Sequence, residues 1–468
     1  METKKRIITE EEREIQRDFA RKVSDLVAGK GKKACVVTYG CQQNEADSER
    51  LAGELVSMGY AMVSSEKEAD VILVNTCAVR EHAELRALSI TGGYKHLKEK
   101  NPDLIIGICG CMVSQVVRSE TIKHSYPYVD FVFGTEHLWR LPEMLYAAIV
   151  GGRGFYPNVG EAVVCEGVPV HRESNFRAWV SIMYGCNNFC TYCIVPYVRG
   201  RERSRRPEDI LAEVERLVKD GYREITLLGQ NVNSYGKEFG DECDFADLLD
   251  RVCAIPGDFI VRFMTSHPKD ASHKLIDTIA RNPKAAKHLH LPLQSGSDRL
   301  LREMNRHYDA DTYRELVSYM REKMPDISLT TDIIIGFPGE TEADFADTLS
   351  MLSEMKYDML FSFLYSKREG TPAARMENQV PEDVKADRMK RLLALQEKIA
   401  EEKAKKEVGK VRRVLCEGES KNNPEKLTGR TEGNKIVLFD GELFLKGTFV
   451  NVKITEGAAF ALYGEIVD

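Results

Sequence analysis

The sequence predicts a multidomain α/β protein with three folded parts: a doubly wound parallel α/β domain, a partial (β/α)6 barrel and a small β-barrel. The first two parts follow from two separate series in which short apolar runs alternate with helical patterns. The third follows from short β runs separated by glycine and asparagine turns in about the last 60 residues. A chain of 468 residues, 43% of them hydrophobic, is long enough for several cores.

Composition and charge exclude some classes of protein. The sequence lacks a run of about 18 apolar residues, so a membrane-spanning helix is excluded, and the N-terminus lacks the apolar core of a signal peptide. We therefore expect a cytoplasmic protein with no membrane partner. Its 12 cysteines should then be thiols or metal ligands, not disulfides. With a net charge of −7, attraction to a polyanion has to come from local patches.

The N-terminal third divides into an extension, a domain and a linker. Residues 1–32 are mostly charged, show a helical pattern but no core of their own, and are interpreted as a mobile or loosely docked extension. Residues 33–150 alternate strands and helices, which predicts a parallel sheet covered on both faces. Residues 151–171 are rich in glycine and are interpreted as a linker. The expected strands are Ala34–Tyr39, Val71–Asn75, Leu104–Cys109 and Val129–Phe133, and the expected helices include Ser48–Met58, Glu81–Leu97 and Leu141–Ile149.

One cysteine follows each of three successive strands of this domain, namely Cys41, Cys77 and Cys111. Because ligands of open α/β sheets sit beyond the carboxyl ends of the strands, we expect the three thiols to meet there. They would form a second three-cysteine metal site. The alternative is three unrelated buried residues, since cysteine is often simply apolar core. Cys109 is a rival ligand, but its place inside a strand favours a core role.

Residues 172–400 hold six β/α repeats, which predict a TIM-like partial barrel. The long helical pattern Glu382–Glu407 runs into the last predicted domain, residues 401–468, whose short β runs predict a small, OB-like β-barrel. The expected strands are Ala178–Met183, Glu224–Leu228, Phe259–Met264, His288–Leu291, Leu329–Ile335 and Met359–Leu364 in the first part, and Val411–Cys416, Ile436–Leu438, Phe449–Ile454 and Ala461–Ile466 in the second. The expected helices of the first part include Pro207–Lys219, Phe245–Val252, His273–Ala280, Tyr313–Met324 and Glu342–Met355.

A C-x3-C-x2-C motif, Cys186, Cys190 and Cys193, follows the first strand of the predicted barrel, at the face where barrel active sites assemble. Three thiolates are one short of the four that iron–sulfur clusters and structural zinc sites usually take. A cluster held this way leaves one iron open for a small molecule. Structural zinc is the alternative, but the nearest candidates for a fourth ligand, Cys165 and His171, precede the strand.

Five arginines occupy the eight residues from Arg199 to Arg206, directly behind this motif. If the segment is extended, every second side chain lies on one face, and such a stripe would follow a phosphate backbone. The alternative is a set of ion pairs with neighbouring acids such as Glu202. The candidate nucleic-acid-binding residues are Arg199, Arg201, Arg203 and Arg205.

The cysteine motif resembles the signature of the radical S-adenosylmethionine (SAM) superfamily, C-x3-C-x-aromatic-C, with Tyr192 as the aromatic residue. The segments 228–236 and 331–340 end barrel strands where that superfamily holds SAM. For each segment, ordinary turn chemistry between strand and helix is the alternative. The resemblance implies a SAM vicinity that includes Tyr192, Gly229, Gln230, Gly336 and Glu340.

From about residue 33 to the C-terminus the chain is similar to the methylthiotransferase family, which has an N-terminal three-cysteine domain, a radical SAM barrel and a C-terminal TRAM barrel. The segments 39–44, 75–77 and 110–111 carry the N-terminal pattern. The segments 230–235 and 197–205 make it most similar to the MiaB branch, which acts on tRNA. The RimO and MtaB branches, which act on a ribosomal protein and on threonylcarbamoyl adenosine in tRNA, are the alternatives.

The resemblance implies two [4Fe-4S] clusters. Cys186, Cys190 and Cys193 would hold the SAM-binding cluster, and Cys41, Cys77 and Cys111 an auxiliary cluster. One SAM would be the methyl donor. A second would supply the 5′-deoxyadenosyl radical that removes hydrogen from C2 of N6-isopentenyl adenosine 37 in the tRNA anticodon loop, before the methylthio group is attached.

The same resemblance implies the partners: a tRNA anticodon stem-loop and an electron donor such as flavodoxin or ferredoxin, with the enzyme acting as a monomer. A hypothesis from a different class is a zinc-containing RNA-binding protein that performs no catalysis. Metal content separates the two, because two cubane clusters contain about eight irons.

Overall fold

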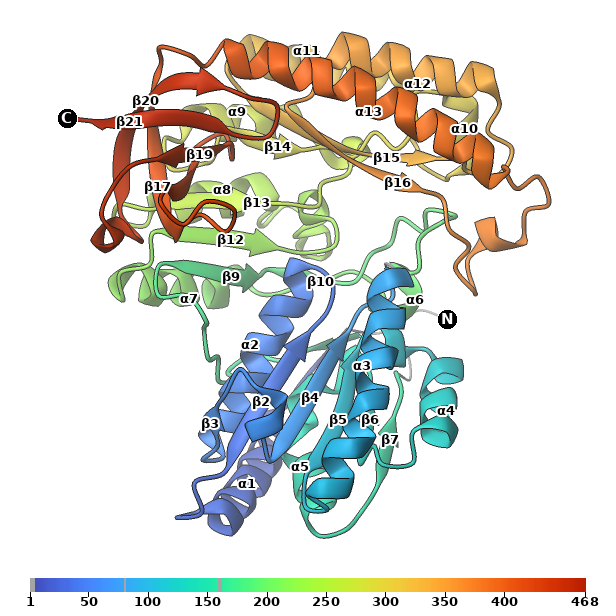
Figure 1. The fold of residues 1–468 in the computed structure, drawn as a ribbon, viewed down its shortest axis with the longest axis vertical. Coiled ribbons are helices and arrows are strands. Elements are labelled where there is room, and N and C mark those ends of the chain that lie inside the picture. The colour runs from blue at the N-terminus through green and yellow to red at the C-terminus, as the bar shows by residue number, and fades with distance from the viewer. Residues whose placement is uncertain (1–4, 80, 159–161) are drawn as a thin grey trace. The chain divides into compact units, whose positions relative to one another are not determined.

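The computed structural model describes residues 5–79, 81–158 and 162–468, and the chain divides into two compact units (Figure 1). Unit 1 comprises residues 1–174, 181–187 and 193–209. Unit 2 comprises residues 175–180, 188–192 and 210–468. In the described ranges no helix is both long and apolar enough to cross a membrane.

Unit 1 is built on a six-stranded parallel sheet with the strand order β3-β2-β4-β5-β6-β7. The four strands expected from the sequence are present within two residues at each end. The two additional strands, β3 and β7, are too short to show alternation in the sequence. The strands are β2 (Lys33–Thr38), β3 (Ala61–Met62), β4 (Val71–Thr76), β5 (Ile105–Gly110), β6 (Phe131–Phe133) and β7 (Gly154–Tyr156).

Helices pack on both faces of this sheet, as the doubly wound prediction requires. One core joins Leu73 and Phe131 of the sheet to α1, α2 and α5, and the other joins Ile72 and Ile106 to α3 and α4. The helices are α1 (Glu10–Val27), α2 (Gln42–Ser57), α3 (Glu81–Lys100), α4 (Val116–Ser125) and α5 (Leu141–Ile149).

The N-terminal extension and the linker are more ordered than the sequence suggests. Helix α1 begins at a capping box formed by Thr9 and Glu12, and its Val23 and Val27 side chains are buried in the core shared with α2 and α5. The prediction of a loose extension is therefore wrong. Because α1 has few apolar positions, the sequence alone does not reveal that it packs on α2 and α5. In the predicted linker, β7 extends the sheet and β8 (Ala162–Val164) pairs with β1 (Lys5–Ile7); residues 159–161 lie outside the described ranges.

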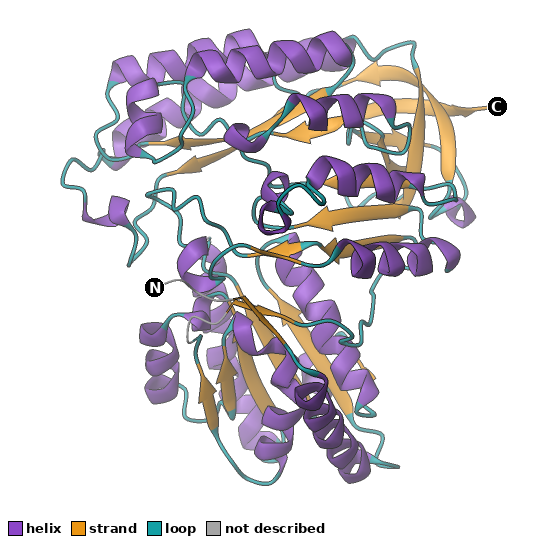
Figure 2. Ribbon diagram, turned by 180° about the vertical axis from the view of Figure 1, so that it is seen from behind, coloured by secondary structure: helices purple, strands orange, loops and turns teal. Residues whose placement is uncertain are grey.

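Unit 2 contains the predicted open barrel, two three-stranded parallel sheets with the orders β13-β12-β9 and β14-β15-β16. A parallel bridge between Val261 and Ala285 connects β13 to the segment before β14. Figure 2 shows the helices outside the strands. The strands are β9 (Arg177–Ser181), β12 (Glu224–Leu228), β13 (Ile260–Phe263), β14 (His288–His290), β15 (Ser328–Ile335) and β16 (Met359–Leu364), and the helices are α7 (Pro207–Lys219), α8 (Phe245–Ala254), α9 (His273–Arg281), α10 (Asp298–Glu303), α11 (Ala310–Lys323), α12 (Glu342–Met355) and α13 (Glu382–Lys405).

The C-terminal strands form a closed barrel in the order β17-β18-β19-β21-β20, which confirms the second predicted barrel. Strand β18 was not expected, because its Gly429 interrupts the apolar pattern. Arg262 of β13 donates to the carbonyl of Thr431 at 2.9 Å and anchors this barrel on the first one. The strands are β17 (Val411–Glu419), β18 (Leu427–Thr431), β19 (Ile436–Phe439), β20 (Phe449–Gly457) and β21 (Leu462–Val467).

Candidate metal centres

Cys41, Cys77 and Cys111 lie at one edge of the unit 1 sheet. They follow β2, β4 and β5, which are adjacent and parallel, so their carboxyl ends share that edge. The Cys111 N–H donates to the carbonyl of Thr76 at 2.9 Å, next to Cys77. A Cβ placed on Gly40 would lie 2.7 Å from the Cβ of Cys77, so only glycine lets these segments approach so closely. The structure thus brings together the three strand ends that carry the thiols.

The electrostatic environment of Cys111 also shows that the other two thiols lie near it. Burial raises the pKa of the Cys111 thiol to about 12; Arg199 opposes this rise, and the nearby Cys77 and Cys41 thiols add to it. In the described part of the chain, no three His, Cys, Asp or Glu side chains are close enough to share one metal ion. A cubane cluster binds each thiolate through a different iron, so its ligands are spread more widely. Three thiols carried by one sheet edge are the ligand type that iron–sulfur clusters take.

Cys109, the rival ligand, is part of the apolar core on the α1, α2 and α5 face of the sheet. It is fully buried, and burial raises the pKa of its thiol well above the usual range. Both observations favour a core role.

A polar network holds the edge of the sheet that carries the three cysteines. The amide of Asn44 donates to the carbonyls of Tyr39 and Thr76, at 2.7 and 2.9 Å, and so ties the β2 and β4 ends together. The guanidinium of Arg199 donates to Asn44 Oδ1 at 2.7 Å and to Asp47 Oδ2 at 2.8 Å. Its Nε donates to the sulfur of Cys111 at 3.1 Å. One arginine therefore links the network to a cysteine.

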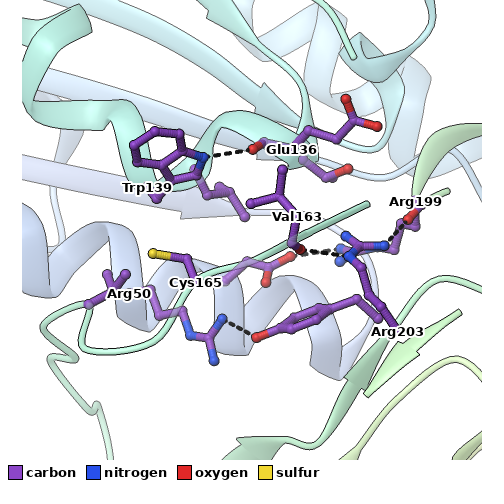
Figure 3. A pocket seen from close by; sticks show the side chains of 12 residues that line it. Arg50, Glu136, Trp139, Val163, Cys165, Arg199 and Arg203 are labelled. Carbon is purple, nitrogen blue, oxygen red and sulfur yellow. Dashed lines mark hydrogen bonds and ion pairs between the residues drawn. The ribbon is translucent and has the colours of Figure 1, made fainter. Parts of the chain in front are cut away.

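A pocket of about 50 Å³ borders this network within unit 1 (Figure 3). Asp47 and Arg199 form part of its wall, and Arg203 donates to the carbonyl of Val163 at 2.6 Å. Across the pocket, Arg50 donates to the hydroxyl of Tyr184. The volume is enough for a few water molecules. The other lining residues are Thr135, Glu136, Leu138, Trp139, Cys165 and Val168.

The second cysteine motif lies in an irregular loop between β10 (Met183–Tyr184) and α6 (Val195–Val198). Cys186 and Cys193 belong to unit 1, and Cys190 belongs to unit 2. Cys186 and Cys190 are buried and Cys193 is half-buried. Phe189 has a positive φ of 48°, which is unusual for a bulky side chain and marks a tightly constrained loop. The loop follows the first barrel strand, as expected.

Asn305 and Arg306 hold the Cys190 segment within unit 2. The amide of Asn305 donates to the carbonyls of Asn188 and Phe189 at 3.0 and 3.1 Å. Nη1 of Arg306 lies 3.5 Å from the sulfur of Cys190 and donates to it. Sequence reasoning missed both residues. Their only signal is an adjacent amide and guanidinium in a short segment between two helices.

Gly336 and Glu340, two of the residues expected near SAM, are partners of each other. The Gly336 N–H donates to a Glu340 carboxylate oxygen at 2.7 Å, and Arg388 donates to the same oxygen at 2.8 Å. The φ of Gly336 is +73°, and a Cβ there would lie 2.4 Å from the Lys385 stem. Only glycine fits this turn, and the Glu340 carboxylate stabilises it by accepting the Gly336 N–H.

The other expected SAM residues lie at strand ends and in the barrel core. Tyr192 packs against the apolar cluster that includes Leu300 and Phe337. The carbonyl of Gly229 accepts a hydrogen bond from Thr265 Oγ1 at 2.6 Å. Gln230, directly after β12, is half-buried.

Buried polar atoms without a hydrogen-bond partner gather at the carboxyl ends of the barrel strands, in the segments after β12, β13, β14 and β16. Such atoms are costly unless a ligand or water satisfies them. A polar cofactor such as SAM, with its amino, carboxylate and ribose groups, fits this set. The atoms belong to Asn231, Asn233, Ser266, His267, Gln294 and Tyr365.

The arginine stripe differs from the prediction, which is wrong for three of its four residues. Arg199, Arg203 and Arg205 are only 5%, 4% and 3% exposed, and Arg201 is exposed. Arg205 pairs with Glu166 at 2.6 Å. The segment is extended only at β11 (Arg203–Ser204), because α6 precedes it and a glycine with a φ of +74° follows Arg199. The side chains therefore do not alternate along one face.

Three family models match the chain, one in each predicted domain. They are "Uncharacterized protein family UPF0004" over residues 33–134, "Radical SAM superfamily" over residues 180–352 and "TRAM domain" over residues 405–467. The matched ranges agree with the sheet domain, the open barrel and the closed barrel of the structure.

Curated relatives match almost the whole chain. Proteins named tRNA-2-methylthio-N(6)-dimethylallyladenosine synthase are 53% identical over 93% of this chain and 97% of theirs in Clostridium perfringens, and 50% identical over 98% of both chains in Thermoanaerobacter pseudethanolicus. Among solved structures, the radical SAM methyltransferase TsrM from Kitasatospora setae matches with a TM-score of 0.55 and 14% identity, over 73% of this chain and 75% of that one. That likeness shows the fold alone.

Proposed function

The chain belongs to the family of tRNA-2-methylthio-N(6)-dimethylallyladenosine synthases, and from this membership we propose that it is a radical SAM methylthiotransferase that attaches a methylthio group to C2 of isopentenyl adenosine 37 in the tRNA anticodon loop. The single observation that carries the proposal is identity of about half of all residues over nearly the full length of these relatives. Three matching domain models in the same order support it.

We assign one [4Fe-4S] cluster to each cysteine set. Cys41, Cys77 and Cys111 would hold the auxiliary cluster; the shared sheet edge and their mutual electrostatic influence support this. The second set, Cys186, Cys190 and Cys193, would hold the SAM-binding cluster, supported by the motif spacing and the matching superfamily model. Each set offers three thiolates, so each cluster would keep one open iron.

When bound, the clusters and SAM would supply the one-electron cleavage of SAM, the adenosyl radical and the methyl group, with the electron coming from an external donor. The chain's own residues position these groups. Asn44 fixes two of the strand ends that carry the first cysteine set, and Asn305 fixes the backbone before Cys190. The unpartnered polar atoms after β12, β13, β14 and β16 would bind SAM and the base.

We propose tRNA, an electron donor such as flavodoxin or ferredoxin, and a monomeric state for the active enzyme. On the C-terminal barrel, Phe444 and Phe460 are 78% and 79% exposed. Exposed aromatic rings stack on single-stranded bases, so this surface suits an anticodon stem-loop. The buried arginines of the 199–205 segment are unsuited to that contact, and among the four proposed residues only Arg201 is accessible to phosphate.

Nucleoside analysis of tRNA from a deletion strain tests the activity. We expect 2-methylthio to be lost while isopentenyl adenosine is retained, and restored by the wild-type gene. Unchanged isopentenyl-derived nucleosides would contradict the proposal; loss of the methylthio group from threonylcarbamoyl adenosine would instead indicate the MtaB-like reaction. Iron and sulfide analysis of anaerobically purified protein tests the cluster count, with about eight irons expected for two cubanes.

A further inference from the structure

Two buried arginines each donate a hydrogen bond to a cysteine sulfur, one in each unit. Arg199 is 5% exposed and its Nε lies 3.1 Å from the sulfur of Cys111. Arg306 is 4% exposed and its Nη1 lies 3.5 Å from the sulfur of Cys190. Burying a guanidinium is costly unless all its donors find partners. Each of the two side chains is therefore fixed by its hydrogen bonds, and in both cases one of these bonds goes to the sulfur of a predicted cluster ligand.

The charge of Arg199 is balanced by a carboxylate. Its Nη2 donates to Asp47, which is 1% exposed, and to the amide oxygen of Asn44. Asp47 also accepts a hydrogen bond from Gln43 at 3.3 Å. The Cys111 sulfur therefore receives a directed N–H···S hydrogen bond from a guanidinium whose positive charge is largely offset.

The charge of Arg306 is not balanced in this way. Its other donors go to the carbonyl of Pro292 at 2.8 Å and to the hydroxyl of Tyr308 at 3.2 Å. Tyr308 in turn donates to the carbonyl of Leu293 at 2.7 Å. In the described ranges of the chain no carboxylate partners Arg306. The Cys190 sulfur therefore receives a hydrogen bond together with a nearly full positive charge.

Hydrogen bonds to ligand sulfurs and nearby charge set the reduction potentials of iron–sulfur clusters, because reduction adds negative charge to the cluster. We propose that Arg199 and Arg306 are positioning residues that tune the two clusters separately, Arg199 through Cys111 and Arg306 through Cys190. The inference rests on the proposed two-cluster function. It predicts that each arginine raises the potential of its own cluster, and that Arg306 does so more strongly because its charge is not offset.

The test of this proposal is an anaerobic redox titration of the reconstituted full-length enzyme. The EPR signal of each reduced cluster reports its reduction potential. The two signals are separated in backgrounds where one cysteine set is changed to Ala. For the first cluster the variants are Asp47→Asn, which keeps the donor and removes the counter-charge, and the double change Arg199→Met with Asp47→Asn, which removes both. For the second cluster they are Arg306→Met and Arg306→Lys. Arg203→Met is the matched control: Arg203 is 4% exposed, and in the described ranges it donates to the backbone carbonyls of Val163, Arg199 and Arg201 and not to a sulfur.

We expect opposite signs at the first cluster: Asp47→Asn should raise its potential, and the double variant should lower it below the wild-type value. Arg306→Met should lower the equilibrium constant for one-electron reduction of the second cluster up to tenfold, which corresponds to about 59 mV, while Arg306→Lys should restore most of the loss. The variants at Asp47 and Arg199 should leave the potential of the second cluster unchanged, and the variants at Arg306 should leave that of the first unchanged. Arg203→Met should change neither potential.

Unchanged potentials at full iron content would overturn the inference, as would equal shifts of both clusters in every variant, since these would indicate a general structural effect. A wild-type protein that binds only about four irons would instead refute the two-cluster function. The two failures are therefore distinguishable by iron content before any potential is measured.

Discussion

Replacing Glu54 by Gln should stabilise the protein at neutral and alkaline pH. Glu54 lies on α2 and is 8% exposed. Its neighbour Gly53 is so closely covered that a Cβ there would lie 2.3 Å from the carbonyl oxygen of Pro169. Burial raises the pKa of the Glu54 carboxyl from 4.5 to about 7. At neutral pH and above, the folded protein therefore holds a buried carboxylate that the unfolded chain exposes to water.

The sign follows from proton linkage. Between pH 4.5 and 7 the folded state keeps this proton and the unfolded state releases it, so rising pH favours unfolding. The stability contributed by the protonated carboxyl is fully present below pH 4.5 and is lost as pH rises through 7. A shift of about 2.5 units corresponds to roughly 3 kcal/mol. Gln keeps the shape without the charge, so Glu54→Gln should gain about 3 kcal/mol at pH 8 and less than about 1 kcal/mol at pH 5.

Urea unfolding of wild-type and Glu54→Gln enzyme, prepared anaerobically with iron and compared at pH 5 and pH 8, measures the effect. Glu14→Gln on α1 is the control: Glu14 is exposed, and hydrogen bonds from Arg17 and Arg21 lower the pKa of its carboxyl, so its replacement should not stabilise at either pH. A Glu54→Gln advantage that is equal at both pH values, or absent at pH 8, would refute the linkage reasoning.

Three further predictions concern the sites. Cys41→Ala should leave SAM cleavage intact and abolish methylthio product in anaerobic turnover assays; residual product would contradict the role of this cysteine. Asn305→Ala removes two hydrogen bonds to the loop before Cys190 and should cost about 1–3 kcal/mol, seen as faster iron loss to a chelator, whereas unchanged iron retention would argue against a positioning role. Phe444→Ala and Phe460→Ala should each weaken tRNA binding by about 1–3 kcal/mol in filter binding without altering SAM cleavage without tRNA; unaltered affinity would exclude stacking at that residue.

The sequence predicts the positions of most of the longer strands and helices. Strands β12 and β16 and helices α7 and α12 have the expected bounds. Strand β12 is buried along its whole length and α12 buries one apolar face, so hydrophobic spacing specifies them; β16 has the expected bounds although it is only partly buried. Short strands such as β3 have no period to detect, and the docking of α1 depends on α5, which lies more than a hundred residues away. These features are decided by tertiary contacts that local sequence does not contain.

The cysteine sites show the same division between chemistry and geometry. Cysteine spacing relative to the strands predicted that Cys41, Cys77 and Cys111 share a sheet edge, because parallel strands all end on one side. The direction of the Arg199 side chain was not predictable, because alternation holds only in an extended chain and Arg199 ends a short helix in the right-handed region. Its burial reverses the interpretation. The sequence predicts that the Arg199 guanidinium contacts phosphate. In the structure it donates to Asp47 and to the Cys111 sulfur instead. For a charged run beside a cysteine motif, burial therefore decides whether a guanidinium can reach a nucleic acid or contacts a cysteine sulfur instead.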